Sequence, residues 1–159
     1  MVDSYDSVSN RNKRVKDGVT TTWTYDAAYR LSGQQKTGEW ATYSYDSVGN
    51  VLVQQRQGMS TETHTYDTAN RIVTSNRGGT ITTFTYDANG NPTLENINAN
   101  PQTYTYDKEN RLTVLQWSSG TARSTYTYAG DGLRRSTFEN GGSRTTMIWD
   151  GDDYLMEKS

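Results

Sequence analysis

Cysteine is absent from this chain of 159 residues, and histidine occurs only once. Without cysteine, neither a disulfide framework nor a thiolate metal site can form. The net charge is −2, so the sequence lacks the basic footprint of a protein that binds nucleic acid. No signal peptide, lipidation motif or apolar run of membrane-spanning length is visible, so we expect no membrane insertion.

Aliphatic residues are also few. Only 31% of the chain is hydrophobic, against roughly 45–50% in ordinary globular domains, and the scarcity of Leu and Ala argues against long helices. Low hydrophobicity is typical of disorder, but disordered chains are poor in aromatic and β-branched residues. This chain has 12 Tyr, 4 Trp and many Thr, which favour a pleated, half-buried surface. The composition predicts an all-β chain with a thin aromatic core.

A Tyr-Asp pair recurs along the whole sequence, with successive tyrosines 20 to 22 residues apart. Regular self-similarity of this kind marks a repeat architecture. We predict a single array over residues 1–159 with about seven repeats, the first of them truncated as if by a cut through a longer array. The copies are Tyr5-Asp6, Tyr25-Asp26, Tyr45-Asp46, Tyr66-Asp67, Tyr86-Asp87, Tyr106-Asp107 and a degenerate Tyr128-Ala129.

The residues before each pair alternate between a hydroxyl side chain and a ring, as in Thr22-Trp23-Thr24-Tyr25. A period of two is the signature of a strand, with rings on one face and hydroxyl groups on the other. Stacked copies would form an aromatic ladder opposite a threonine ladder, with cross-strand pairs worth roughly 0.2–1 kcal/mol each. The predicted packed ladder consists of Tyr25, Tyr45, Tyr66, Tyr86, Tyr106 and Tyr128.

Each Tyr-Asp pair is followed by residues that favour a turn. The carboxylates of Asp26, Asp46, Asp67, Asp87 and Asp107 are expected to accept bonds from backbone amides, as in an Asx-turn. The fourth residue after the tyrosine is Tyr29, Gly49, Asn70, Gly90, Asn110 or Gly132, and we expect a positive φ there, with Tyr29 mildly strained. The next position is often Arg or Asn: Arg30, Asn50, Arg71, Asn91 and Arg111.

A second strand follows each turn, with apolar residues two apart such as Val51 and Val53 or Leu112 and Val114. It ends in a further turn signal, which is typical of a hairpin. The predicted fold is all-β: tandem hairpin repeats in a continuous, twisted antiparallel meander of the solenoid or shell-wall type, with about 14 strands at two per repeat. The second-strand turns are Thr37-Gly38, Gly58, Gly78-Gly79, Ser119-Gly120 and Asn140-Gly141-Gly142.

The pattern aromatic-x-Tyr-Asp-x-x-(Gly/Asn)-(Arg/Asn)-(Leu/Ile/Val) resembles the YD repeat of RHS proteins, a family with relatives in teneurins and in the B and C components of bacterial toxin complexes. The segment 145–159, which includes Trp149-Asp150-Gly151-Asp152, is similar to a late strand of the RHS core. The resemblance implies a sheet that winds around a hollow shell and encloses a toxin domain or other cargo. It also implies a bacterial protein that is secreted or displayed at the cell surface.

The family resemblance carries no catalytic residue over to this chain. The aspartates that cut off the C-terminal domain in many members have no counterpart here, so we expect no enzyme, no metal and no cofactor. About 14 strands spaced by about 4.8 Å give a ribbon roughly 65 Å wide. A wall around a ~100-residue domain needs a circumference of about 150 Å. The chain is therefore expected to be part of a longer shell, with the rest of an RHS polypeptide as its partner.

Two other functions stay open beside this scaffold. Open sheet edges invite pairing with identical chains, which would build a filament or a surface layer. Rings on a sheet can also stack on sugars, so a carbohydrate-binding repeat module is the other alternative, with a glycan as partner.

Individual residues that suggest other chemistry have simpler explanations. His64 occupies the aromatic position of its repeat, and no nucleophile motif accompanies it. The Tyr-Asp carboxylates recur in every repeat, whereas a catalytic pair of carboxylates would be singular. The segment Asp87–Asn91 starts like a calcium loop but lacks Gly at the sixth position and Glu at the twelfth. The cluster Asp150, Asp152 and Asp153 is most simply a solvated turn.

Overall fold

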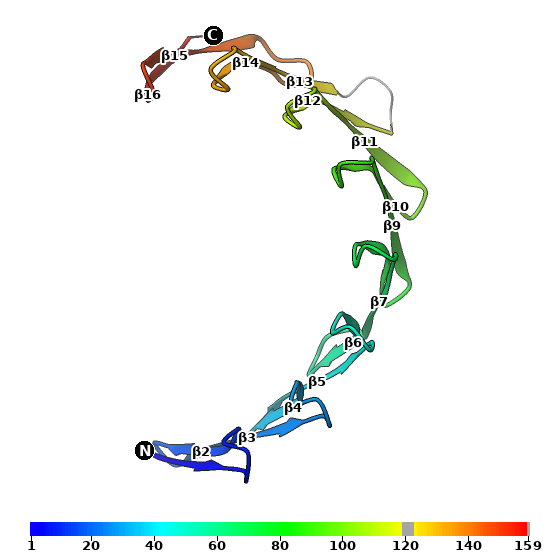
Figure 1. The fold of residues 1–159 in the computed structure, drawn as a ribbon, viewed down its shortest axis with the longest axis vertical. Helices are drawn as coiled ribbons and strands as arrows, with labels where there is room; N and C mark the ends of the chain where they lie inside the picture. Colours follow the sequence, from blue (N-terminus) through cyan, green and yellow to red (C-terminus); the bar gives the residue numbers. More distant parts are fainter. Residues whose placement is uncertain (119–122, 159) are drawn as a thin grey trace. The chain divides into compact units, whose positions relative to one another are not determined.

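The computed structural model describes residues 1–118 and 123–158, and this part of the chain contains sixteen strands and no helix (Figure 1). The first eight are β1 (Val2–Tyr5), β2 (Arg11–Lys16), β3 (Val19–Tyr25), β4 (Leu31–Lys36), β5 (Glu39–Tyr45), β6 (Val51–Arg56), β7 (Glu62–Tyr66) and β8 (Ile72–Arg77). The others are β9 (Thr80–Tyr86), β10 (Pro92–Ile97), β11 (Asn100–Tyr106), β12 (Leu112–Trp117), β13 (Arg123–Tyr128), β14 (Arg134–Phe138), β15 (Arg144–Asp150) and β16 (Asp153–Lys158).

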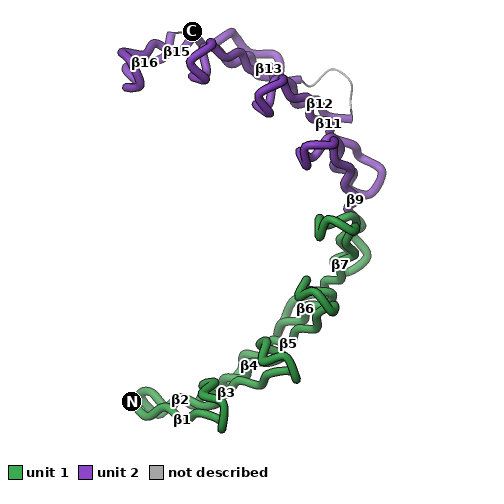
Figure 2. The backbone as a smooth tube through the Cα atoms, viewed as in Figure 1, with its two compact units in different colours: residues 1–81 green, residues 82–159 purple. Residues whose placement is uncertain are grey.

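The chain divides into two compact units, residues 1–81 and residues 82–159 (Figure 2). Within each unit every strand pairs antiparallel with the next strand in the sequence, as in β3 with β4 and β11 with β12. The predicted all-β meander is confirmed. The strand count of about 14 was too low, because residues 144–158 form a complete hairpin of β15 and β16 instead of one late strand.

The register separates the two faces of the sheet as the alternating pattern predicted. Thr22 and Thr24 of β3 pair with Gln35 and Gly33 of β4, while Trp23 between them pairs with Gln34. We call these the hydroxyl face and the ring face. Met147 is the only buried hydrophobic residue among the described residues, so most side chains of the thin core are half-buried.

A β-bulge recurs where each Tyr-Asp hairpin begins its second strand. Thr24 pairs with Gly33 but Tyr25 pairs with Leu31, which leaves Ser32 unpaired. The bulge changes the interpretation of the apolar spacing. Val51 pairs with Tyr45, and Val53 pairs with Ser44, so residues two apart belong to opposite faces. The bulged residues are Asn12, Ser32, Leu52, Val73, Thr93, Thr113, Arg135 and Leu155.

Two turns between repeats carry no glycine pair and escaped the sequence analysis. Asp17-Gly18 and Asn98-Ala99 each join two strands through two residues of positive φ, the conformation that two-residue hairpins require. The predicted turn at Ser119-Gly120 lies outside the described residues. No helix in the described part of the chain has the length and apolar character needed to cross a membrane.

Candidate functional site: the Tyr-Asp turn

The repeated Tyr-Asp turn is the site that the sequence singles out, and its backbone closes the same way in every repeat. The N–H of Asp26 donates to the carbonyl of Arg30 at 2.9 Å, and the N–H of Tyr29 donates to the carbonyl of Asp26 at 3.0 Å. The fourth residue after the tyrosine has the expected positive φ throughout, including the crowded Tyr29 at 61°. The other values are 70° for Ser9, 103° for Gly49, 61° for Asn70, 90° for Gly90, 61° for Asn110 and 88° for Gly132.

The aspartate side chain holds this turn together. Oδ1 of Asp67 accepts the backbone N–H of Ala69 at 2.9 Å and that of Arg71 at 3.0 Å. The same pair of bonds, with distances of 2.8–3.0 Å, is formed by Asp6, Asp26, Asp46, Asp87 and Asp107. One carboxylate thus satisfies two amide donors that the tight turn leaves without a backbone partner.

The degenerate Tyr128-Ala129 repeat lacks the turn aspartate, but another aspartate takes over its role. Ala129 keeps the backbone bonds of the turn, with its N–H 3.0 Å from the carbonyl of Leu133. Asp131, two residues later, accepts the N–H of Leu133 at 2.9 Å and pairs with Arg135. Sequence reasoning missed Asp131, although an aspartate close to the expected position was the available signal.

The second carboxylate oxygen binds the side chain four residues on, which alternates along the chain. Oδ2 of Asp26 accepts Nε of Arg30 at 2.7 Å, whereas Oδ2 of Asp46 accepts Nδ2 of Asn50 at 2.8 Å. We call the first kind arginine turns: Asp26–Arg30, Asp67–Arg71 and Asp107–Arg111. The asparagine turns are Asp6–Asn10, Asp46–Asn50 and Asp87–Asn91.

These bonds lower the pKa of the turn carboxylates below their ordinary range. For Asp26, the backbone N–H of Arg30 is the largest cause; partial burial opposes it, and the Arg30 side chain adds to it. For Asp46, partial burial raises the pKa, but the bonds from the side chain and backbone of Asn50 more than offset this effect. The carboxylates are therefore ionised acceptors at neutral pH, which suits a turn cap and not a proton donor.

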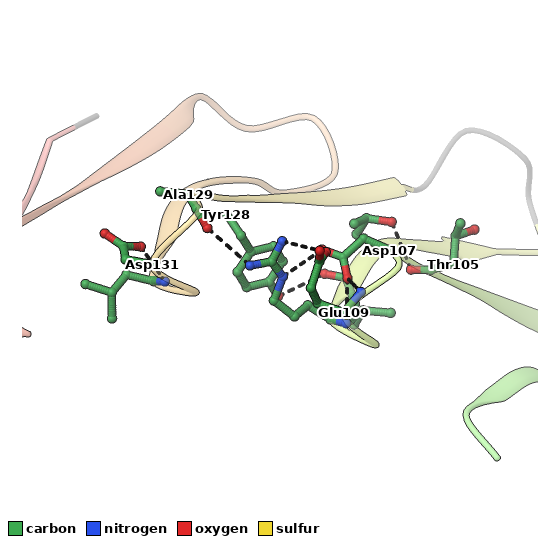
Figure 3. Close-up of polar contacts among 10 residues, drawn as sticks. Thr105, Asp107, Glu109, Tyr128, Ala129 and Asp131 are labelled. Carbon is green, nitrogen blue, oxygen red and sulfur yellow. Dashed lines mark hydrogen bonds and ion pairs between the residues drawn. The ribbon is translucent and has the colours of Figure 1, made fainter. Parts of the chain in front are cut away.

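The residue that binds Oδ2 also reaches the next repeat. In the arginine turns, Nη1 of Arg30 donates to the carbonyl of Asp46 at 2.7 Å, and its guanidinium lies 4.6 Å from the ring centre of Tyr45. Arg111 repeats this bridge to the carbonyl of Ala129 at 3.1 Å (Figure 3) and lies 4.9 Å from the ring of Tyr128. A charged group thus links two successive turns through one hydrogen bond and one cation–π contact.

The asparagine turns reach the next repeat through side-chain amides. Nδ2 of Asn50 donates to Oδ1 of Asn70 at 3.0 Å, and Nδ2 of Asn91 donates to Oδ1 of Asn110 at 2.9 Å. The acceptor is the residue of positive φ in the following arginine turn. The alternation therefore gives the array a pattern of two repeats, which sequence reasoning did not recognise although the letters Asn, Arg, Asn, Arg were visible.

Four of the repeat tyrosines close the gap between their repeat and the preceding one. The ladder between β6 and β7 ends at Val53 and Thr63, and the carbonyl of Val51 beyond it accepts the hydroxyl of Tyr66 at 2.8 Å. Burial raises the pKa of Tyr66, and the Asp46 carboxylate adds to the shift, so the phenol stays protonated and donates. The same bond joins Tyr25 to Arg11, Tyr45 to Leu31 and Tyr128 to Leu112, at 2.7–2.9 Å.

Trp149 takes the place of the tyrosine in the last hairpin. Its Nε1 donates to the carbonyl of Arg134 at 2.9 Å, and Arg134, like Leu112, is the first residue of the preceding second strand. Its position in the register matches that of the tyrosines, because Trp149 pairs with Tyr154 across a bulge. In this hairpin the Trp149 indole thus performs the capping contact of the phenol, whereas Asp150 pairs with Asp153 across a two-residue turn that differs from the Tyr-Asp turn.

Two other ionisable side chains, His64 and Tyr104, make contacts within the sheet. His64 packs beside Tyr66 with ring centres 6.3 Å apart, and its Nε2 lies 3.7 Å from Oε1 of Glu62. Tyr104 donates to Glu95 at 2.9 Å, and burial together with this carboxylate raises the pKa of Tyr104 to about 12. The described residues include no group of three or more His, Asp or Glu side chains arranged to hold a metal ion.

The hairpins, bulges and turn cages together define a tandem β-hairpin repeat. Residues 66–96 match the family model of the RHS Repeat, so the resemblance predicted from the sequence is confirmed. No curated protein matches the chain. The match covers the hairpins around Tyr66-Asp67 and Tyr86-Asp87, from the end of β7 to β10.

Solved structures with a similar fold include three that contain TccC3. The chain resembles the crystal structure of TcdB2-TccC3-TEV (16% identity, TM-score 0.75, 94% of this chain and 10% of that one). It also resembles that of TcdB2-TccC3-Cdc42 (17% identity, TM-score 0.69, 84% and 9%). A third is the Photorhabdus luminescens Tc holotoxin pore with a mutation in TccC3 (16% identity, TM-score 0.51, 94% and 12%). The chain thus spans about a tenth of each of these.

Proposed function

We propose that the chain is a segment of the wall of a larger RHS-type protein and acts as a non-enzymatic scaffold. The observation that carries this proposal is the bonding between repeats. Arg30, Asn50 and Tyr66 each satisfy a polar group of a neighbouring repeat. A repeat built this way contributes stability only beside its neighbours, as in other solenoid arrays, and the array extends by adding copies.

The fold similarity supports the same proposal. Nearly the whole chain superposes on a small share of the Tc toxin structures, which is the relation of a wall segment to a complete shell. The partner would be the rest of a longer RHS polypeptide, and a toxin domain would be the enclosed or presented cargo. Such a complex would be secreted or displayed on a bacterial surface. The turn residues Asp26, Asp46, Asp67, Asp87 and Asp107, with their tyrosines, would be the structural residues of that wall.

A second function, self-assembly through strand edges, is favoured by β16. All six of its residues are exposed, and these include Tyr154, Leu155 and Met156, each at least half exposed. An exposed apolar edge strand invites pairing with another chain. Identical chains would then add end to end into a filament instead of forming a wall within one polypeptide.

Light scattering over a range of protein concentrations, with electron micrographs of the same samples, separates the two functions. The wall proposal predicts a constant mass of 17.9 kDa, because the bonds between repeats are satisfied within one chain. Open-ended filaments whose length grows with concentration would overturn it in favour of self-assembly. The variant Leu155→Lys places a charge on β16 and is the matched control, since it should dissolve filaments that form through this edge.

A further inference from the structure

The hydroxyl face of the sheet is a regular grid in which two positions of one repeat stand out. At the centre of each repeat, between two Thr or Ser residues of the flanking strands, most strands hold a side chain such as Val53, Leu94 or Val114. In β4 this position is Gly33, which pairs with Thr24 on one side and Thr42 on the other.

The second departure is an indole on the face of hydroxyl groups. Trp40 pairs with Gln35, and Gln35 pairs with Thr22. The corresponding position, five residues before the repeat tyrosine, holds Thr20, Ile81 or Pro101 in other repeats. Trp40 is 37% exposed, so part of its ring faces solvent. An indole and a missing side chain thus occur together on this face of one repeat, and local departures of this kind are expected at functional sites.

The two departures form one hollow. A cavity of about 320 Å³ is lined by Thr22, Thr24, Gly33, Gln35, Trp40 and Thr42, together with Gln34 and Ala41. This volume is near the lower end of small-molecule sites, which span roughly 300–1,000 Å³. A second hollow of about 350 Å³ shares Thr22 and Gln35 with it and continues past Thr20 to Gly38. Together they make a trough over β3 and β4 that begins at the indole.

The lining of the first hollow defines the chemistry of a ligand. It contains no charged residue, whereas four other hollows in the described part of the chain each contain Lys, Arg or Glu. Its polar groups are hydroxyls and amides, which both donate and accept hydrogen bonds. The Thr24 hydroxyl, which lines the hollow, accepts a hydrogen bond from Ser32 Oγ at 3.2 Å and can still donate its own proton. A flat apolar ring beside neutral donors and acceptors matches a molecule with one apolar face and a rim of hydroxyl groups.

We propose that the hollow formed by Gly33 and Trp40 binds a neutral sugar ring, with the trough accommodating a second sugar of an oligosaccharide. The indole would pack against the C–H face of the pyranose by dispersion and hydrophobic contact. Gln35, Thr24 and Thr42 would hydrogen-bond its hydroxyl groups. The site is independent of the wall proposal. It also lies on the hydroxyl face, and not on the ring face where the sequence suggested sugar stacking.

Gly33 leaves the hollow open because it has no side chain, although its backbone conformation does not require glycine. Its φ lies outside the left-handed region, and a Cβ placed on it would meet Oγ1 of Thr24 at 2.6 Å. The hydroxyl of Thr24 therefore occupies part of the space that a side chain would take. Val114 faces Thr105 in the same pairing elsewhere, so a side chain fits here once the threonine turns its χ1. The variant Gly33→Val is thus expected to fold and to fill the hollow.

The test is a titration of the intact chain followed by two-dimensional ¹H–¹⁵N NMR. The probes are glucose, galactose, N-acetylglucosamine, cellobiose, lactose and chitobiose, each up to about 20 mM, which detects millimolar affinity. At least one sugar should give a saturable shift of the Trp40 indole and of the Gly33 and Thr42 amides, with tighter binding of the disaccharide. The Trp23 indole, on the ring face of the neighbouring β3, should not move.

Three variants make the result specific to the site. Gly33→Val and Trp40→Thr should each weaken binding at least tenfold, whereas Ile81→Thr, which removes an exposed apolar side chain from the same repeat position, should leave it unchanged. If Gly33→Val fails to fold by circular dichroism, Trp40→Thr carries the test. If none of the six sugars causes a saturable shift of these signals, the proposal is overturned. Binding that persists in Trp40→Thr, or that moves the signals of the ring face instead, also overturns it.

Discussion

The arginine turns and the asparagine turns perform the same task with different chemistry. In both, Oδ1 of the aspartate accepts two backbone amides, as at Asp26 and Asp46. They differ at Oδ2 and in the bridge to the next repeat. Arg30 uses a charge, a carbonyl and a ring, whereas Asn50 uses one neutral amide. The comparison indicates that the aspartate cage makes the turn, and that the residue four positions later connects repeats.

Acid should lower the melting midpoint more than any single substitution, because it protonates the aspartates of both kinds of turn at once. The pKa values of Asp6, Asp26, Asp46, Asp67, Asp87 and Asp107 are all lowered in the folded chain. Carboxylates with a lowered pKa contribute stability that is complete above the unfolded-state value of about 4. This stability is lost as the pH falls through the folded-state values.

We therefore expect the melting midpoint to be constant between about pH 5 and 7 and to fall by more than about 10 °C towards pH 2. Thermal unfolding followed by circular dichroism measures it. In the Asp26→Asn variant one titrating cage is removed, so the acid limb should be shallower than in the unmodified chain. A midpoint that stays constant down to pH 2 would show that the cages contribute nothing to stability.

Removal of a single carboxylate should affect the two kinds of turn equally. Asp26→Ala and Asp46→Ala each lose the acceptor of two backbone amides, and each should lower the melting midpoint by about 3–6 °C, by analogy with a lost helix cap. Asparagine in place of the aspartate keeps one acceptor but no charge. Asp26→Asn should therefore lower the melting midpoint more than Asp46→Asn. An equal decrease in these two variants would contradict the distinction between ionic and neutral turns.

The tyrosine caps should be insensitive to the kind of turn. Tyr66→Phe leaves the ring in place but removes the donor to the carbonyl of Val51, and it should destabilise the chain by about 1 kcal/mol. Tyr45→Phe removes the same bond to Leu31 in an arginine interface and should have a similar effect. Urea unfolding gives both values. Tyr29→Phe is the control, because the exposed Tyr29 caps no carbonyl in the residues described.

Exchange of the bridging residues tests the connection between repeats directly. Arg30→Asn removes the bridge to Asp46 and the contact with Tyr45, and it should lower the melting midpoint by about 1–3 °C. The loss of stability should be smaller in high salt, because Arg30 also forms a partly exposed ion pair with Asp26 that salt screens. Asn50→Ala in the neighbouring turn should show no dependence on salt. A salt effect of the same size in both variants would remove the difference between the turns.

The sequence predicts the repeat, its two faces and its turns well, because each depends on local residue types at a fixed spacing. Thr24 and Tyr25 show which features cannot be predicted from local sequence. Their alternation correctly separates the faces, but nothing in it reveals that Ser32 bulges out of the opposite strand. The bulge, the bond from Tyr45 to Leu31 and the bridge from Arg30 to Asp46 are contacts between strands, and a pattern read along one strand does not contain them.

Tyr29 gives the smallest and most local comparison between an arginine turn and an asparagine turn. It adopts a φ of 61° where Gly49 adopts 103° in the next turn, and a bulky L-residue in the left-handed region is strained by about 1–2 kcal/mol. Glycine removes this strain but loses more backbone entropy on folding, so the two effects partly cancel. Tyr29→Gly should raise the melting midpoint by about 1–3 °C, whereas Gly49→Ala should lower it. A lower midpoint for Tyr29→Gly would mean that the exposed ring contributes more through contacts than its backbone costs, so that tyrosine stands in this turn because of its side chain.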